Sequence, residues 1–304
     1  MKKFNLHFRA LCGMALFVSA VVTFSSCTEE VDNLSNQETR RCAPVSVHVK
    51  DFSVSMEDPN TRATDVASYD GIKALTLAFY DTNGTEVYKT TQQKSDNTTY
   101  TTFGQFKLNL YKGSYTMVVV GRDYFANDVF TLTSPTEAAY TGARARETFT
   151  STQAVDITNT NAVNLNTTLD RIVAKVLVES TDIRIAEADS IRTTLSAGGK
   201  SFNPSTGLAL TNTGYSNTLK GSGTKNDAVA QVGTYVFLHS DEQTMNVTID
   251  VLDKDKNVIT HREVNNVPLK RNRTTKLTGL LFSASLTSTF QVNADWLPEE
   301  EVSF

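Results

Sequence analysis

Short runs of alternating apolar and polar residues recur along most of this 304-residue chain, and they constrain its fold more than any other feature. In one run Leu75, Leu77 and Phe79 share a parity, and the Asn83-Gly84 pair follows as a turn signal. Successive side chains of a strand point to opposite faces, so a period of two predicts half-buried strands. Many such runs separated by hairpin turns indicate an all-β chain built of β-sandwiches.

The longest early run predicts a strand that covers a core and contains a bulge. Val45, Val47 and Val49 share one face, and Phe52 resumes the alternation with the opposite parity. One extra residue in a strand produces this change of phase. The sequence therefore predicts a bulge at Lys50-Asp51.

One segment carries signals for a helix. Ser134-Pro135-Thr136-Glu137 offers an N-cap, a proline at the first helical position and a capping-box glutamate. Alanines follow between Ala138 and Arg146. We therefore expect one short helix within the first of the sandwiches.

The N-terminus reads as a bacterial lipoprotein leader. A basic start is followed by an apolar stretch from residue 10 to 24 that is too short for a comfortable membrane span. Ser25-Ser26-Cys27 then resembles a lipobox, in which the thiol is acylated and the leader is cut just before it. We expect a signal peptide at 1–26, lipid on Cys27 and a polar tether at 27–44. The competing interpretation is an ordinary signal peptide with an incidental cysteine.

Cysteine usage agrees with this processing. Cys12 leaves with the leader and Cys27 carries lipid, so Cys42 is the one thiol left in the mature chain. We therefore expect no intramolecular disulfide.

Charge and missing motifs exclude several functions. Removing three basic leader residues from Lys+Arg 29 leaves 26 against Asp+Glu 33, so the mature chain is acidic and nucleic acid is not an expected partner. His48, His239 and His261 have no metal-ligand spacing, and no nucleophile or phosphate-loop motif occurs. We expect no enzyme activity, no metal and no cofactor, although distant carboxylate pairs for glycoside hydrolysis stay open.

Several phrases resemble the fimbrillin superfamily of type V fimbriae from Bacteroidetes, and most of all its lipid-anchored anchor or accessory subunits. They are Tyr69–Lys73, Leu77–Asp81, Val267–Gly279 and the close from Phe290 to Trp296. The resemblance implies two transthyretin-like β-sandwich domains, which we place at 45–167 and 168–304. It also implies assembly with other fimbrial subunits by β-strand exchange, in which a sheet groove receives a strand from a neighbour.

In stalk subunits of that superfamily an arginine-specific protease removes the lipidated N-terminal piece and frees the groove. Arg62, after the first strand run, and Arg41, in the tether, are the candidate cleavage sites here. The alternative is that both are ordinary exposed arginines. The acidic pair Glu29-Glu30 next to Cys27 resembles a surface-export signal, so the expected location is the outer face of the outer membrane.

Two functions therefore compete. The first is a structural fimbrial subunit, an anchor or accessory piece attached to the outer membrane through acyl chains on Cys27. The second is a surface or tip adhesin that binds glycan or host protein through the polar loop Gly198–Lys225, which we expect to be mobile. Trp296, the one tryptophan, is in phase with Phe290 and is expected in a core; an exposed aromatic that grips a sugar is the alternative.

Overall fold

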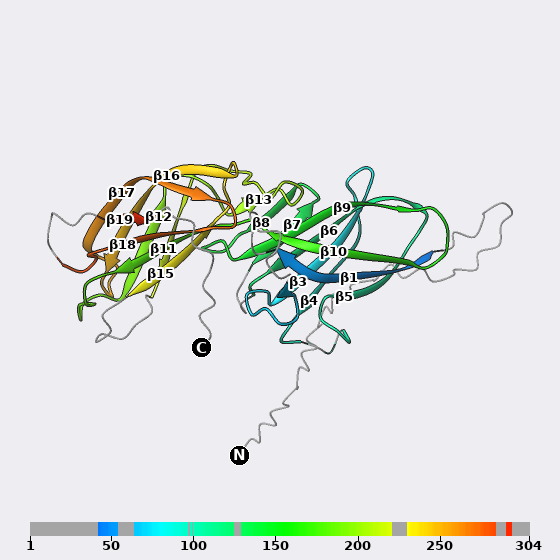
Figure 1. Cartoon of the computed structure of the whole chain (residues 1–304), viewed down its shortest axis with the longest axis horizontal. Helices are drawn as coiled ribbons and strands as arrows, with labels where there is room; N and C mark the ends of the chain where they lie inside the picture. The colour runs from blue at the N-terminus through cyan, green and yellow to red at the C-terminus, as the bar shows by residue number, and fades with distance from the viewer. Residues whose placement is uncertain are drawn as a thin grey trace, which may run out of the picture. The chain divides into compact units, whose positions relative to one another are not determined.

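The computed structural model describes residues 42–53, 64–96, 98, 100–124, 129–220, 230–283 and 290–293, and every regular element among them is a β-strand (Figure 1). The predicted all-β class is confirmed. Within these ranges no helix is long and apolar enough to cross a membrane. The predicted signal peptide and most of the predicted tether lie outside the described residues.

The first sheet holds most of the described residues before position 172, which we call the N-terminal half. Its strand order is β2-β1-β10-β9-β6-β3-β4, and β5 pairs with β1 outside this path. The bounds are β1 Ala43–Ser53, β2 Thr64–Asp65, β3 Ala74–Asp81, β4 Glu86–Gln93, β5 Gln105–Leu110, β6 Gly113–Arg122, β9 Thr148–Ile157 and β10 Val163–Arg171.

This sheet closes on itself around one core. β9 and β10 pair through only two registered residue pairs, Asp170 with Thr150 and Arg171 with Phe149. Buried side chains of β1 and β5 nevertheless share one hydrophobic cluster with those of β3 and β6. Strands that are distant within the sheet can share a core only if the sheet folds over, which makes the N-terminal half a sandwich of two layers.

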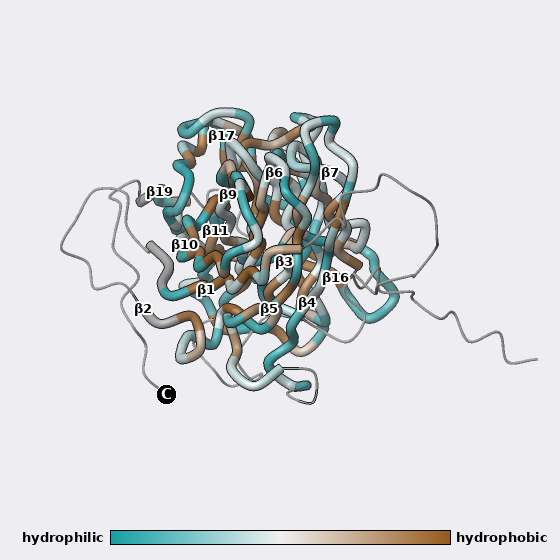
Figure 2. Tube along the Cα trace, turned by 90° about the vertical axis from the view of Figure 1, so that its right-hand side faces the viewer, coloured by the Kyte–Doolittle hydropathy of each residue, from teal (hydrophilic) through white to brown (hydrophobic). Residues whose placement is uncertain are grey.

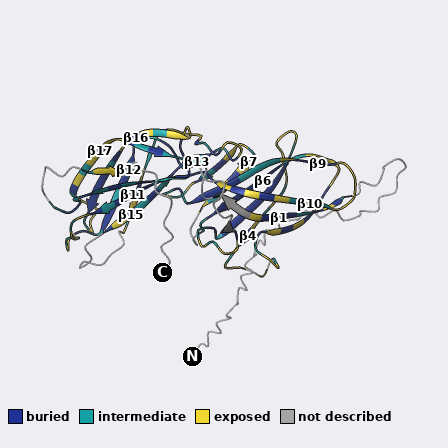
Figure 3. Cartoon of the chain, viewed as in Figure 1, coloured by how far each residue is buried: buried dark blue, intermediate teal, exposed yellow. Residues whose placement is uncertain are grey.

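Two four-stranded sheets face each other after residue 173, in what we call the C-terminal half. Their orders are β15-β11-β18-β19 and β14-β12-β16-β17. The bounds are β11 Ala174–Ser180, β12 Ser190–Leu195, β14 Tyr215–Leu219, β15 Gln231–Val236, β16 Glu242–Leu252, β17 Val258–Lys270, β18 Thr274–Gly279 and β19 Gln291–Asn293. Alternate residues of both sheets are buried in a single cluster between them (Figure 3).

A small sheet covers the outer face of β3 and β6. It has the order β13-β8-β7, with β7 Phe130–Ser134, β8 Glu137–Tyr140 and β13 Ser201–Phe202. Its residues form a third cluster with Ala78 and Tyr80 of β3. β3 is therefore buried on both faces, and Figure 2 shows the hydrophobic stretches that this arrangement requires.

The expected helix at 134–146 is wrong. Phe130 and Leu132 of β7 pair with Tyr140 and Ala138 of β8 in a hairpin. The helix-start signature forms the turn instead, because Ser134 Oγ accepts a hydrogen bond from Thr136 N at 3.2 Å. Burial decides the outcome, since the period-two set of apolar side chains fills the third cluster and local propensity is overridden.

The described part of the segment expected to be loop-dominated, residues 198–220, is mostly turns and loops, as predicted, and the expected mobility stays a prediction. Two short strands, β13 and β14, lie within it, and Phe202 of β13 is completely buried. Its ring stacks on Phe237 with centroids 4.4 Å apart. Glycine and serine content predicted the loop, and a few aromatics anchor it.

Candidate functional site

The first described strand lies inside its sheet and not at an edge. β1 runs parallel to β10, with Val45 opposite Val163, and antiparallel to β5, with Val45 opposite Leu108. A strand with partners on both sides uses its backbone N–H and C=O groups in both directions. We call the position of β1 between β5 and β10 the first-strand slot (Figure 1).

Alternate side chains of β1 close the core of the N-terminal half. Val45 and Val47 are 1% and 0% exposed, whereas Ser46 between them is half-buried. Phe106 and Leu108 of β5 are buried in the same cluster. Each fully buried aliphatic side chain contributes about 1.5–3 kcal/mol. Removal of β1 would therefore uncover an apolar groove and leave two strand ladders without partners.

The predicted irregularity at Lys50-Asp51 is confirmed. The register between β1 and β10 shifts between Val49 and Asp51. Beside the shift, Val49 N donates to Gly104 O at 2.8 Å. Gly104 has a φ of +87°, and a Cβ there would lie 2.9 Å from Val49 O, so this close approach requires glycine.

Cys27, Arg41, Arg62 and Trp296, the four residues with predicted roles, lie outside the described residues. Their roles stay predictions. The described strands still fix the place of the two arginines along the chain. Arg41 precedes β1, whereas Arg62 falls between the end of β1 and the start of β2. A cut after Arg41 therefore leaves β1 attached to the rest of the chain, whereas a cut after Arg62 separates β1 from it.

Three further expectations, for Phe290, Val292 and Cys42, have different outcomes. Phe290 packs against the core of the C-terminal half, as its phase predicts, but Val292 is 37% exposed on the short strand β19. Cys42 is disulfide-bonded, which contradicts the expectation of no intramolecular disulfide.

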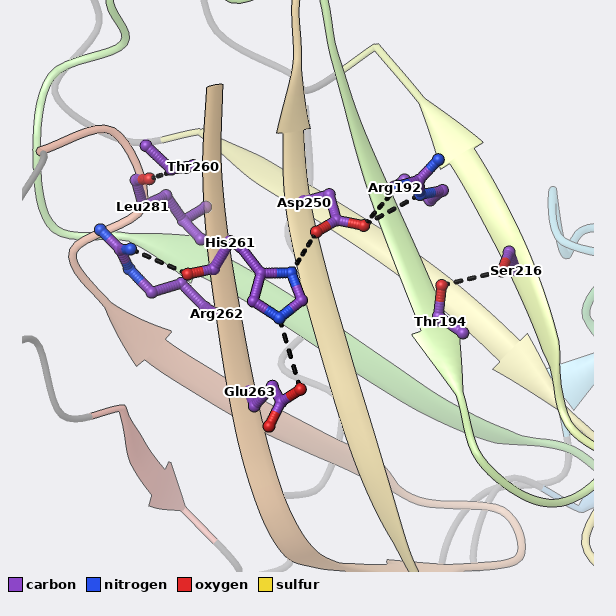
Figure 4. A network of polar contacts seen from close by, with 9 residues as sticks. All are labelled: Arg192, Thr194, Ser216, Asp250, Thr260, His261, Arg262, Glu263 and Leu281. Atoms are coloured by element: carbon purple, nitrogen blue, oxygen red, sulfur yellow. Dashed lines mark hydrogen bonds and ion pairs between the residues drawn. The ribbon is translucent and has the colours of Figure 1, made fainter. Parts of the chain in front are cut away.

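A second group of polar residues crosses the sheet β14-β12-β16-β17. Arg192 of β12 donates two hydrogen bonds to Asp250 Oδ2 of β16, at 3.0 and 2.7 Å. Asp250 Oδ1 lies 2.6 Å from Nδ1 of His261 on β17, and the other ring nitrogen lies 3.3 Å from Glu263 Oε1. Figure 4 shows the four side chains in a row across three strands. The hydroxyl groups of Thr194 and Ser216 are hydrogen-bonded, with their oxygens 2.8 Å apart, and continue the polar surface to β14.

The electrostatics of this row favour a structural role. Hydrogen bonds that the ring donates to Asp250 and then to Glu263 raise the pKa of His261, because both carboxylates favour the charged ring. Both imidazole nitrogens face carboxylates, so the ring has no nitrogen directed at a hydroxyl that it could activate. Asp250 is almost fully buried and is held by Arg192 on one side and His261 on the other. The row therefore ties three strands together.

Sequence reasoning missed this row. Arg192 and Asp250 are 58 residues apart, and their approach depends on strand register. The one available signal was local: His261 and Glu263 are separated by two residues in a strand and so share a face. Among the described residues no group of three or more His, Cys, Asp or Glu side chains could hold a metal ion.

Comparison with protein families gives one match. The model described as "Family of unknown function (DUF6562)" matches residues 43–303. Comparison with curated proteins finds no match.

Solved structures with the same fold come from Bacteroides and Porphyromonas species. The fimbrial anchor protein Mfa2 from Porphyromonas gingivalis superposes with a TM-score of 0.51 at 10% identity, covering 84% of this chain and 99% of that one. A protein from Bacteroides ovatus that is proposed to be an adhesin gives 0.52 at 11%, covering 87% and 98%. Proteins from Bacteroides thetaiotaomicron that are proposed to bind polysaccharide give 0.50 at 11%, covering 85% and 99%. The predicted resemblance to fimbrial proteins thus holds at the level of the fold.

Proposed function

The chain belongs to the family of unknown function DUF6562, and we propose that it is a structural subunit of type V fimbriae at the cell surface, acting as an anchor or accessory piece. Acyl chains on Cys27 hold it in the outer membrane, which requires that the Cys27 thiol is not the partner of Cys42 in its disulfide. The fold shared with a fimbrial anchor protein and the lipobox at Ser25-Ser26-Cys27 support the proposal. Two or more long acyl chains give stable membrane attachment, because each buried CH₂ contributes about 0.8 kcal/mol.

The observation that carries the proposal is the position of β1. It is an interior strand, yet it joins the rest of its sheet through the chain segment that contains Arg62. Cleavage after Arg62 would detach Cys27 and β1 together and vacate the first-strand slot. Cleavage after Arg41 would release the lipid and leave the slot filled. A chain that stays lipid-anchored through Cys27 therefore keeps β1 in place.

This logic separates an anchor from a stalk subunit. A stalk subunit needs an open slot to receive a donor strand. An anchor keeps its own β1 and exchanges strands elsewhere. We place that exchange at the β19 edge of the C-terminal half, where β19 pairs with three of the six residues of β18. Backbone N–H and C=O groups along a sheet edge can pair with a strand of another chain.

The proposed architecture is two transthyretin-like sandwiches with a boundary at 167/168. A repeated strand arrangement supports it: β1 runs parallel to β10 and β11 runs parallel to β18, each near the start of its half. The central core position of Trp296 belongs to the same proposal.

The mature N-terminus tests the role. Protein purified from its native cells is digested, and its first peptide is identified by mass spectrometry. The anchor role predicts a diacylated or triacylated peptide that begins at Cys27, and Cys27→Ala should move the protein out of the membrane fraction. A mature chain that begins at Ala63 would contradict the anchor role and assign the chain to the stalk or tip. Arg62→Ala and Arg41→Ala each remove one candidate cleavage site, so the two variants show which arginine, if either, is cut.

A second candidate is a surface adhesin that binds glycan or host protein. The fold shared with proteins proposed to be adhesins or to bind polysaccharide favours it. Purification of the native fimbriae separates the two roles. A structural subunit copurifies with the other fimbrial proteins in fixed proportion, whereas loss of host-cell attachment with fimbriae intact would favour the adhesin.

A further inference from the structure

A polar cavity of about 530 Å³ lies beside the corner where β9 meets β10. The loop 203–207 after β13 and the turn at 271–272 between β17 and β18 complete its walls. Its volume falls within the range of about 300–1,000 Å³ that is typical of ligand sites. Most such sites are apolar, but hydroxyl, carboxylate, amide and guanidinium groups dominate this lining. The walls therefore suit an occupant that both donates and accepts hydrogen bonds.

Two guanidinium groups line the cavity, and acids outside the lining balance both. Arg171 Nη2 lies 2.8 Å from Glu147 Oε1, and Arg271 Nη2 lies 2.8 Å from Asp241 Oδ1. Arg271 Nη1 also donates to Thr206 O at 2.6 Å. The guanidinium charges are therefore largely compensated, which disfavours a free anion as occupant.

Two other polar groups of the lining make no hydrogen bond with the described residues. Thr152 Oγ1 is buried without a hydrogen bond. The carboxylate of Asp170, an exposed residue, accepts no hydrogen bond from the described residues. Partial desolvation raises the pKa of Asp170 despite the nearby positive charge of Arg271. A buried hydroxyl without a hydrogen bond is unfavourable, so Thr152 favours an occupant that satisfies it, and the exposed carboxylate of Asp170 offers that occupant an acceptor.

We propose that this cavity binds a neutral, polyhydroxylated molecule the size of a mono- or disaccharide. A sugar hydroxyl donates to Asp170 and accepts from a guanidinium or from Thr152 at the same time. An anion would meet the Asp170 carboxylate, and an amine would meet two guanidinium groups. The inference is independent of the fimbrial role, and it deepens the second candidate function by naming a site and a ligand class for it.

Three sugars with the same ring and different charge test the class of ligand. The full chain is titrated with glucose, glucuronate and glucosamine, and then with galactose, mannose, N-acetylglucosamine and lactose, by calorimetry and ligand-observed NMR. We expect at least one neutral sugar to bind at millimolar concentration or below. Tighter binding of glucuronate or glucosamine than of every neutral sugar, or no binding of any neutral sugar, would overturn the proposal.

Two variants tie the binding to the cavity. Asp170→Asn and Thr152→Val should each weaken the affinity about tenfold, as expected for loss of a hydrogen bond to a charged or buried group. Asp156→Asn on β9 and Thr168→Val on β10 are the matched controls, since neither residue lines the cavity. Equal losses in variants and controls would place the binding elsewhere.

Thr152→Val has a second readout with the opposite sign. Because its hydroxyl is buried without a partner in the empty protein, valine should leave the melting temperature of the ligand-free chain unchanged or raise it. A raised or unchanged melting temperature with weakened sugar binding supports the site. A lowered melting temperature would show that the hydroxyl serves the fold, and would remove this support.

Discussion

The two halves of the chain begin with strands in matching positions. β1 lies between the parallel strand β10 and the antiparallel strand β5, and β11 lies between the parallel strand β18 and the antiparallel strand β15. Val47 of β1 and Val176 of β11 are both completely buried. In hydrogen bonding and burial the two strands are therefore equivalent.

They differ in how the chain holds their ends. β11 follows β10 after only Ile172 and Val173, which are both buried. Just past its other end, Asp182 accepts hydrogen bonds from the backbone N–H groups of Leu281 at 2.8 Å and Ser283 at 2.7 Å. β1 has no such clasp among the described residues that follow it. β11 is therefore fixed at both ends, whereas a single cut in the chain could detach β1 from the equivalent position in the other half.

The largest expected effect is on the N-terminal half when β1 is removed. Deletion of residues 43–53 uncovers the core and breaks two ladders, a loss comparable with the roughly 5–15 kcal/mol that stabilise a typical domain. We expect the N-terminal half to lose its cooperative unfolding transition in calorimetry. A synthetic peptide of residues 43–53 should restore the transition when it is added in trans.

A peptide carrying Val47→Asp is the matched control, because it places a charge in the core and should not restore folding. If the deleted chain unfolds with the wild-type transition and without any peptide, β1 is dispensable and the first-strand slot has no role in exchange.

A pair of smaller substitutions compares the two strands directly. Val47→Ala and Val176→Ala remove equal volumes from fully buried positions, so each should cost about 2 kcal/mol in chemical unfolding. Only Val47→Ala should speed the exchange of β1 for the added peptide in a chain cut experimentally after Arg62. Equal exchange behaviour in the two variants would mean that the slot gives β1 no special lability.

The clasp on β11 can be weakened separately. Asp182→Ala removes the acceptor for three backbone N–H groups and should destabilise the C-terminal half by about 1–3 kcal/mol. Burial alone would raise the pKa of Asp182, but the hydrogen bonds from Ser180 and from the backbone of Leu281, Ser283 and Phe282 hold it below its ordinary value.

The sign of the pH dependence follows from the lowered pKa. A group whose pKa is depressed on folding stabilises the protein above its unfolded pKa of about 3.9, and this contribution disappears as the pH falls through the folded value. The difference in unfolding free energy between wild type and Asp182→Ala should therefore shrink below about pH 4. A difference that is independent of pH would show that the carboxylate charge is not what holds the segment.

The alternating patterns predicted the strands well, because a period of two reports burial on one face wherever strands are long. The same patterns predicted the bulge after Val49, where the parity of the apolar residues changes. The helix at Ser134 failed, since a turn and a helix start share the same Ser-Pro-x-Glu signature and only the distant Phe202 decides between them. Local signals carry no information about such a partner.

The functional residues were less accessible from sequence. The row of Arg192, Asp250 and His261 depends on register between strands far apart in the chain, and the cavity depends on four separate segments that meet at one corner. Cys27 was predicted from the lipobox, Arg62 from the family resemblance and Trp296 from its phase, and their roles stay predictions because they lie outside the described residues.

The smallest expected effect is the pH-dependent contribution of His261 to the stability of the C-terminal half. Hydrogen bonds to Asp250 and Glu263 raise the pKa of His261, so its charged form stabilises the folded state below the unfolded pKa of about 6.5. That stabilisation is lost as the pH rises through the raised folded value. His261 is about half exposed, so His261→Gln should cost only a few tenths of a kcal/mol at pH 5.5 and nothing at pH 9.

Glu263→Gln removes only the more distant carboxylate and should lower the pKa of His261 measured by NMR less than Asp250→Asn does. A pKa that responds equally to the two substitutions would mean that the short contact with Asp250 does not dominate, and the row would then not hold β16 and β17 together.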